Sequence, residues 1–161
     1  MTQLDANEDL QPLPSHYDRC FGCGRAQPGG LHMVMEGGGN RVRGSFVVTE
    51  HHEGAPGLAH GGVIGAAMDE GMGHLLWLVG EPAVTAHLEV DFRRPVPVGS
   101  RLELEGTIGP VEGRKIHASM TGRVDGEVAV EGRAVFVKVS VEHFRPHAER
   151  AKRRFEAPFN P

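Results

Sequence analysis

The residues with the clearest chemical potential lie in one segment, 60–70, which reads His-Gly-Gly-Val-Ile-Gly-Ala-Ala-Met-Asp-Glu. Apolar side chains dominate 63–79 and leave almost no polar face, which predicts a buried helix. Gly61 and Gly62 leave backbone N–H groups uncovered at the start of that helix, and helix N-termini favour developing negative charge. Asp69 lies inside the same helix, where a carboxylate is costly unless it is paired or used. The segment therefore offers a candidate oxyanion site and a candidate catalytic carboxylate.

Gly61 and Asp69 are too far apart on one helix to act on the same carbonyl group. They are eight residues apart, and a helix rises ~1.5 Å per residue, so about 12 Å separates them. Two copies of the helix lying antiparallel would place Gly61 of one subunit opposite Asp69 of the other. The segment therefore predicts a symmetric homodimer with two shared sites.

Glu70 is the second carboxylate of the segment. As the next residue along the helix, it points about 100° away from Asp69. His74 follows one turn later, at a spacing that allows an ion pair. We therefore interpret Glu70 as a structural residue and Asp69 as the chemical one.

Two cysteines, Cys20 and Cys23, form a Cys-x2-Cys pair in a glycine-rich stretch. Such a pair is half of a zinc site. His16 and His32 lie nearby in the sequence, but their spacing matches no recognised zinc motif. Without a second pair, we interpret the two cysteines as small buried thiols in a tight loop, and we expect no metal and no other cofactor.

The composition narrows the class of protein. A chain of 161 residues suits one domain with its own core. The formal net charge of −4 indicates no nucleic-acid partner. The start of the sequence lacks the basic and apolar regions of a signal peptide, and glycines and ionisable residues interrupt 63–79, which argues against a membrane span. We expect a cytoplasmic protein without nucleic-acid or membrane partners.

The rest of the chain predicts a sheet that covers the central helix. Segments 31–36 and 41–48 flank a glycine-rich turn and predict a hairpin before the helix. After the helix, four strands are predicted, over 84–92, 102–108, 114–124 and 127–139. A hairpin, one long apolar helix and four antiparallel strands together predict an α+β fold, with the sheet wrapped around the helix.

Two details of this sheet can be stated from the sequence. Strict alternation in 84–92 predicts that Thr85, His87, Glu89 and Asp91 share one face. The pair Asp-Gly at 125–126 is a strong signal for a tight hairpin turn between the last two strands.

The chain divides into three parts by composition. Residues 1–19 are polar with two prolines and are predicted to form an extended arm. Residues 20–141 form the predicted domain. Residues 142–161 are charged and are predicted to form a solvated tail, with a short helix possible over 147–155.

Several motifs in this order resemble a known family. They are His60-Gly61-Gly62 with Asp69, then Thr85 and the run 92–95 (Phe-Arg-Arg-Pro). The opening at 20–24 (Cys-Phe-Gly-Cys-Gly) with 28–31 (Pro-Gly-Gly-Leu) adds a weaker likeness. Over residues 20–140 the sequence resembles the PaaI-like branch of the hot-dog fold acyl-CoA thioesterases. The resemblance implies an antiparallel sheet wrapped around one long central helix.

The resemblance also implies an activity and roles for four residues. The expected reaction is hydrolysis of an acyl-CoA or acyl-carrier thioester to a free acid and a thiol. Asp69 matches the family's catalytic carboxylate, which acts as nucleophile or as general base for water. Gly61 matches the backbone N–H that polarises the thioester carbonyl, His60 helps to shape the site, and Thr85 can orient water or the carboxylate. Homodimers and homotetramers are both common in such proteins.

Further residues are candidates for substrate binding. Gly62 adjoins the predicted oxyanion site, and Met68 belongs to an apolar set that could line an acyl pocket. Arg93 and Arg94 could hold the phosphates of coenzyme A, and ordinary solvated charge at a strand end is the alternative interpretation.

The loop before the motif, 51–57, departs from the family's pattern because it contains no Asn. His52 or Glu53 could take the place of that residue. His51 and His52 also leave open a second chemistry of this fold, the hydration or dehydration of an acyl thioester. A non-catalytic module that binds acyl-CoA is the other alternative.

Overall fold

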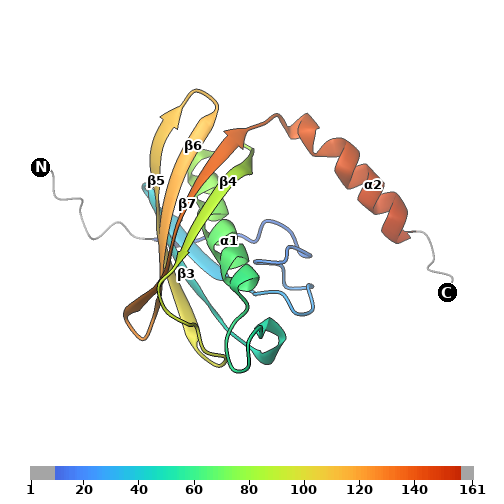
Figure 1. Ribbon diagram of the computed structural model, residues 1–161. Coiled ribbons are helices and arrows are strands. Elements are labelled where there is room, and N and C mark those ends of the chain that lie inside the picture. Colours follow the sequence, from blue (N-terminus) through green and yellow to red (C-terminus); the bar gives the residue numbers. More distant parts are fainter. Residues whose placement is uncertain (1–9, 157–161) are drawn as a thin grey trace, which may run out of the picture.

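In the described part of the chain, seven strands form one antiparallel sheet in the order β1-β2-β3-β5-β6-β7-β4; strands β3 to β7 are labelled in Figure 1. The computed structural model describes residues 10–156. The strands are β1 (Gln11–Pro12), β2 (Val34–Gly38), β3 (Arg41–Val47), β4 (Ala83–Phe92), β5 (Arg101–Glu112), β6 (Lys115–Val124) and β7 (Glu127–Lys138). The predicted α+β fold, an antiparallel sheet with one long helix, is confirmed.

The long helix α1 (Gly61–Val79) lies against one face of this sheet (Figure 1). Its buried side chains include Ile64, Met68, Met72 and Leu75, which are at most 2% exposed. The helix ends at Gly80, where a positive φ of 72° lets the backbone N–H bond to the carbonyl of Leu76. Glycine adopts this left-handed conformation without strain, so it is a favourable helix terminator.

The core lies between α1 and the strands, where several glycines allow close packing. Leu102, Leu104, Ile116 and Phe136 come from the sheet and are at most 2% exposed. A Cβ atom at Gly71 of α1 would fall 2.6 Å from the sulfur of Met120 on β6. An alanine at this position would therefore require the end of the Met120 side chain to move.

Most predicted elements are present, and the described residues contain three further short elements, β1 and two 3-10 helices. The turn at 125–126 has positive φ at both residues, 51° and 81°, as a tight hairpin requires. The predicted arm is not wholly separate, because β1 pairs with β2; residues 1–9 lie outside the described part. The predicted short helix is α2 (Arg145–Glu156), which extends away from the sheet (Figure 1). Two short 3-10 helices, η1 (Glu50–His52) and η2 (Val141–His143), complete the elements.

Strand β4 contains an irregularity that the sequence pattern does not reveal. Its register against β7 shifts between Thr85 and His87, so Ala86 is an extra residue in the ladder. A bulge of this kind reverses the alternation of side chains on one side of it. The prediction that Thr85 shares a face with His87 and the residues after it is therefore wrong.

In residues 10–156, no helix combines the length and the apolar character needed to cross a membrane.

The close packing of the sheet gives a testable difference between two glycines. A Cβ at Gly122 on β6 would lie 2.5 Å from Cγ1 of Val130 and 3.2 Å from Cδ1 of Leu102. We expect Gly122→Ala to destabilise the fold by about 1–3 kcal/mol, because a stiff β-branched side chain must move. Urea denaturation measures this change.

Gly109 on β5 is the matched control. A Cβ there would meet its nearest neighbour, Cβ of His117, at an ordinary 3.5 Å. Gly109→Ala should change the free energy of unfolding by less than about 0.5 kcal/mol. Equal losses in both variants would contradict the packing argument.

Candidate active site

Asp69 and Thr85 are brought together, as the sequence motifs suggested. The hydroxyl of Thr85 donates a hydrogen bond to Oδ1 of Asp69 at 2.8 Å. Asp69 comes from the middle of α1 and is partly buried, and Thr85 comes from the start of β4. The bulge after Thr85 is what turns its hydroxyl toward α1, whereas Glu89 and Asp91 lie on the opposite face of the sheet.

A large cavity opens beside this pair. It has a volume of about 790 Å³, and Asp69 and Thr85 both line it. The rest of its wall is mainly apolar and includes Leu76, Trp77, Val84, Phe136 and Phe144. A carboxylate at the edge of an apolar cavity is a common arrangement in binding and catalytic sites.

The start of α1 forms a second candidate feature. His60 is the N-cap residue, and its Nδ1 accepts a hydrogen bond from the N–H of Gly62 at 2.9 Å. Within residues 10–156, no hydrogen-bond acceptor is recorded for the N–H of Gly61. This leaves the first amide of the helix available to a ligand, at the end where the helix dipole favours negative charge.

Gly61 also lines a smaller pocket of about 270 Å³, together with Ile64, Phe92, Arg93 and Arg94. Two cationic residues therefore border the same space as the available amide. Within one chain, this pocket and the Asp69 cavity share no lining residue. The distance expected along the helix accounts for this separation.

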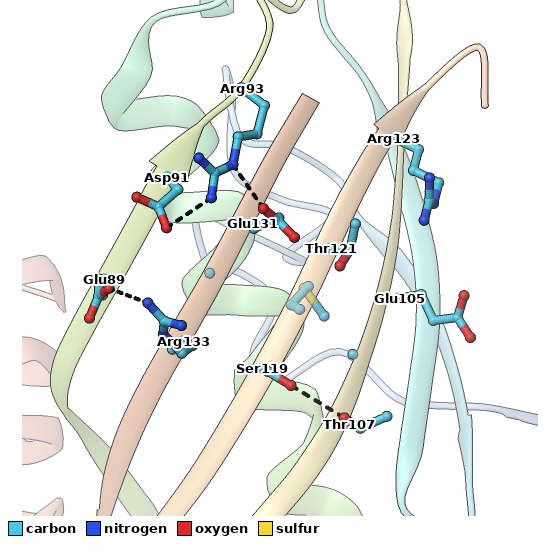
Figure 2. A pocket seen from close by; sticks show the side chains of 13 residues that line it. Glu89, Asp91, Arg93, Glu105, Thr107, Ser119, Thr121, Arg123, Glu131 and Arg133 are labelled. Atoms are coloured by element: carbon cyan, nitrogen blue, oxygen red, sulfur yellow. Dashed lines mark hydrogen bonds and ion pairs between the residues drawn. The ribbon is translucent and has the colours of Figure 1, made fainter. Parts of the chain in front are cut away.

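The two arginines are already engaged in ion pairs, and those of Arg93 lie on the solvent side of the sheet (Figure 2). Arg93 binds Glu131 at 2.8 Å and Asp91 at 3.5 Å. Arg94 binds Glu127 at 3.2 Å. Because these pairs are about half exposed, they are weak, and a phosphate could compete for either guanidinium.

Two predicted substrate contacts lie in the interior instead. His52 is 3% exposed; its Nδ1 accepts from the N–H of Thr49 at 3.0 Å, and its Nε2 lies 3.2 Å from the carbonyl oxygen of Gly30. Met68 is 0% exposed and belongs to the core. Both positions favour structural roles in the single chain, and their contact with substrate stays a prediction.

Glu70 is structural in the way the sequence suggested, but with more partners. Its Oε1 lies 3.5 Å from Nδ1 of His74, the expected partner one turn away, and 2.8 Å from Nδ1 of His16. The thiol of Cys20 donates to its Oε2 at 3.3 Å. His16 and Cys20 lie 54 and 50 positions before Glu70, so no local sequence pattern identifies them as its partners.

This environment shifts the pKa values of several groups. Burial acts to raise the pKa of Glu70, but hydrogen bonds with His16 and Cys23 and the nearby imidazoles outweigh it and lower the pKa to about 2. Burial, aided by Glu70, raises the pKa of the Cys23 thiol to about 12. Burial also lowers the pKa of His74, so this interior imidazole is neutral at pH 7.

Comparison with known proteins agrees with this architecture. Residues 56–131, which include α1, Asp69 and Thr85, match the family model of the thioesterase superfamily. A solved thioesterase superfamily protein is 36% identical and superimposes with a TM-score of 0.61, covering 65% of this chain and 55% of that one. The chain is therefore similar to thioesterase superfamily proteins over this region, and its antiparallel sheet with one long helix is the hot-dog fold of its thioesterase neighbours.

Individual relatives can be named within that superfamily. Acyl-coenzyme A thioesterase THEM5 of Mus musculus is 34% identical over 92 residues, which cover 56% of this chain and 37% of that protein. THEM4 of Xenopus laevis is 34% identical over 90 residues, covering 54% and 40%. The matched region thus spans about two fifths of the length of these curated relatives.

A more distant structure extends the comparison of folds. A hypothetical thioesterase from Streptococcus pneumoniae, solved with coenzyme A, is 15% identical with a TM-score of 0.60 and covers 63% of this chain and 80% of that one. At this identity the likeness concerns the fold.

The geometry of His60 allows its capping role to be separated from any chemical role. We expect His60→Ala to destabilise the protein by about 0.5–2 kcal/mol, because the N–H of Gly62 loses its acceptor. His60→Asn should keep the stability, since Asn is a favoured N-cap residue. Thermal and urea unfolding of the three proteins measure the difference. A stability of His60→Ala equal to wild type would show that the cap contributes nothing.

Proposed function

We propose that this protein hydrolyses acyl-CoA thioesters to a free acid and coenzyme A. The observation that carries the proposal is the carboxylate of Asp69, held by the hydroxyl of Thr85 at the edge of a cavity of about 790 Å³ with a mainly apolar wall. The cavity provides room for an acyl chain, and the carboxylate provides a nucleophile or a base for water at its edge.

Three groups share the chemistry in this proposal. Asp69 either attacks the thioester carbonyl or removes a proton from the attacking water. Thr85 holds one carboxylate oxygen, which fixes the direction of the other. The N–H of Gly61 stabilises the negative charge that develops on the carbonyl oxygen, helped by the dipole of α1. The sulfur of coenzyme A leaves as a thiolate and becomes a thiol by taking the proton that Asp69 removed from water, or a proton from solvent. Where Asp69 itself attacks, water then hydrolyses the acyl–Asp69 anhydride, which releases the free acid and restores the carboxylate.

The proposed site is shared between two subunits. Within one chain, Gly61 and Asp69 are about 12 Å apart along α1, and they line separate pockets. An antiparallel pairing of two α1 helices brings the first turn of each helix beside the middle of the other. A homodimer therefore has two equivalent sites, and a homotetramer is a pair of such dimers.

The choice of coenzyme A as the carrier rests on two kinds of support. The curated relatives are named acyl-coenzyme A thioesterases. In this chain, Arg93 and Arg94 line the pocket that contains Gly61, where their guanidinium groups can exchange weak carboxylate pairs for phosphates. The apolar wall of the larger cavity suits an aryl or a medium-chain acyl group.

Substitution of the carboxylate tests the proposal directly. We expect Asp69→Asn to reduce kcat for thiol release from a panel of acyl-CoA thioesters by about 100- to 10,000-fold, because a neutral amide cannot act as base or nucleophile. The amide oxygen can still accept from Thr85, so folding should be preserved. Glu103→Gln, at an exposed carboxylate of β5, is the control and should keep the wild-type rate.

Other outcomes assign a different function. Unchanged turnover in Asp69→Asn would remove Asp69 from the mechanism. Conversion of enoyl-CoA to hydroxyacyl-CoA without thiol release would indicate a hydratase. Tight binding of acyl-CoA by a folded protein that releases no thiol from any member of the panel would indicate a binding module.

The backbone amide of Gly61 can be removed with little disturbance of the helix. Gly61 is the first helical residue and follows His60, whose φ of −63° and ψ of 136° are compatible with a following proline. We expect Gly61→Pro to fold and to lose about 100- to 1,000-fold in kcat, because it lacks the N–H group. Gly61→Ala keeps the N–H and should keep most of the rate, since its Cβ would lie 3.7 Å from Phe92.

Mixing of inactive variants tests whether the site is shared. Refolding Asp69→Asn together with Gly61→Pro should restore activity, because one site of each mixed dimer combines an intact Gly61 with an intact Asp69. Neither variant should recover when it is refolded alone. Failure of the mixture, with mixed dimers demonstrated by mass spectrometry, would place both groups of each site within one subunit.

A further inference from the structure

Four side chains that the proposed reaction does not use converge beside α1. They are His16, Cys20, Cys23 and Glu70, and one potential ligand atom from each lies within 4.8 Å of all the others. Three come from the segment before β2, and Glu70 comes from the middle of the helix. The segment before β2 lies alongside α1 (Figure 1). The set contains two sulfurs, one imidazole nitrogen and one carboxylate oxygen.

The distances in this cluster fit a tetrahedral metal site. Zinc binds sulfur at about 2.3 Å and nitrogen or oxygen at about 2.0–2.2 Å, so the ligand atoms of a tetrahedron lie roughly 3.3–3.8 Å apart. Here Sγ of Cys23 lies 3.6 Å from Nδ1 of His16, and Sγ of Cys20 lies 3.3 Å from Oε2 of Glu70. Of these three contacts, the 2.8 Å pair of Nδ1 of His16 and Oε1 of Glu70 is closer than a bound cation would allow, and a small opening of that pair relieves it.

The loop that carries the cysteines is tightly built. The N–H of Gly24 donates to the carbonyl of Cys20 at 2.9 Å, which closes the loop. A Cβ atom at Gly24 would collide with backbone atoms of Asp18 and Cys20, and one at Gly22 would collide with the side chain of Glu70. Glycine at position 24 therefore allows the loop to close, and glycine at position 22 allows it to pack against the carboxylate.

Outer contacts orient the ligands as they do in metal sites. The backbone N–H of His16 donates to Sγ of Cys23 at 3.1 Å, a bond that stabilises a thiolate. The hydroxyl of Ser15 donates to the carbonyl of Cys23 at 2.9 Å. The ring of His16 is stacked on Trp77, with centroids 5.7 Å apart. These contacts fix the ligand directions without an ion.

We propose that His16, Cys20, Cys23 and Glu70 bind one Zn²⁺ ion. Two thiolates and an imidazole make a borderline-soft donor set, which suits zinc rather than magnesium or calcium. Four protein ligands close the coordination sphere, which is typical of structural rather than catalytic zinc. On binding, the two thiols release their protons to solvent, and the proton of His16 resides on Nε2, so no oxidation or reduction occurs.

The ion would join the N-terminal segment to α1 at the residue next to Asp69. His16 and Glu70 also line the cavity of about 790 Å³, together with Tyr17. The zinc ion therefore fixes one wall of the cavity without contacting the reacting atoms. This expectation of a metal replaces the interpretation of the cysteines as two simple buried thiols, because the missing ligands come from the distant His16 and Glu70.

Metal content and cobalt spectroscopy of the full chain test the proposal. Reduced protein should bind one equivalent of Zn²⁺, measured by mass spectrometry of the native protein and by elemental analysis. Co²⁺ in place of Zn²⁺ should give the intense visible bands of a tetrahedral site and the near-ultraviolet band of thiolate-to-cobalt charge transfer. A chelator should lower the melting temperature of the zinc-loaded protein.

Single variants identify the ligands. Cys20→Ser, Cys23→Ser and Glu70→Gln should each weaken zinc binding by more than about 100-fold, because even the loss of an outer partner typically costs 10- to 100-fold. His16→Ala should do the same, whereas His51→Ala, at an exposed histidine, should bind as wild type does. Asp69→Asn is the control for Glu70→Gln and should keep the metal whatever happens to thioester hydrolysis.

Several results would overturn the proposal. They are no zinc binding by the reduced wild-type protein, a cobalt spectrum without a thiolate band, and retention of zinc with full affinity in the cysteine variants. The cobalt spectrum of the wild type decides the matter if a cysteine variant fails to fold. Because metal binding is measured without substrate, its outcome is independent of the proposed thioesterase activity.

Discussion

The structure depends on the burial of a helix that has almost no polar face but carries two adjacent carboxylates. A helix that is apolar all round must be covered on every side, and one sheet covers only part of α1. Asp69 and Glu70 interrupt the apolar surface, and each needs polar partners. Two different segments cover the two sides of the carboxylate pair. The start of β4 lies beside Asp69, and the N-terminal segment lies beside Glu70.

The two carboxylates meet very different surroundings although they are neighbours in the sequence. Asp69 faces the start of β4, and within residues 10–156 its one hydrogen-bond partner is the hydroxyl of Thr85. Glu70 faces the N-terminal segment and is surrounded by His16, His74 and Cys20. A carboxylate with many fixed partners is held in place, whereas one with a single partner beside a cavity keeps an oxygen for a ligand. The turn of about 100° between successive helical residues produces this division.

Much of the fold could be predicted from the sequence, because its strongest signals are local. The apolar run 63–79 and the Asp-Gly turn at 125–126 each depend on residues within a few positions of one another. The pair of β1 with β2 was missed because Gln11–Pro12 is too short to show a period. The order of strands in the sheet also has no local signal.

The site could be predicted only in part, for a related reason. Asp69 and Thr85 were identified through the family resemblance, but the predicted face of Thr85 was wrong because alternation cannot reveal the extra residue in β4. The cluster around Glu70 joins residues 54 positions apart, and no spacing rule connects them. The sequence could identify half of that cluster, the Cys-x2-Cys pair, but not its completion.

The bulge in β4 also affects how related chains should be aligned. The bulge shifts the alternation of side chains along this strand by one position. An odd-numbered polar residue before Ala86 faces α1, whereas an odd-numbered polar residue after it faces solvent. An alignment can place the gap one position away from Ala86 and still match the apolar residues of most of the strand. Such an alignment assigns Thr85 to the solvent-facing surface. In this fold, the position of an insertion in β4 therefore decides which threonine or serine counts as the counterpart of Thr85.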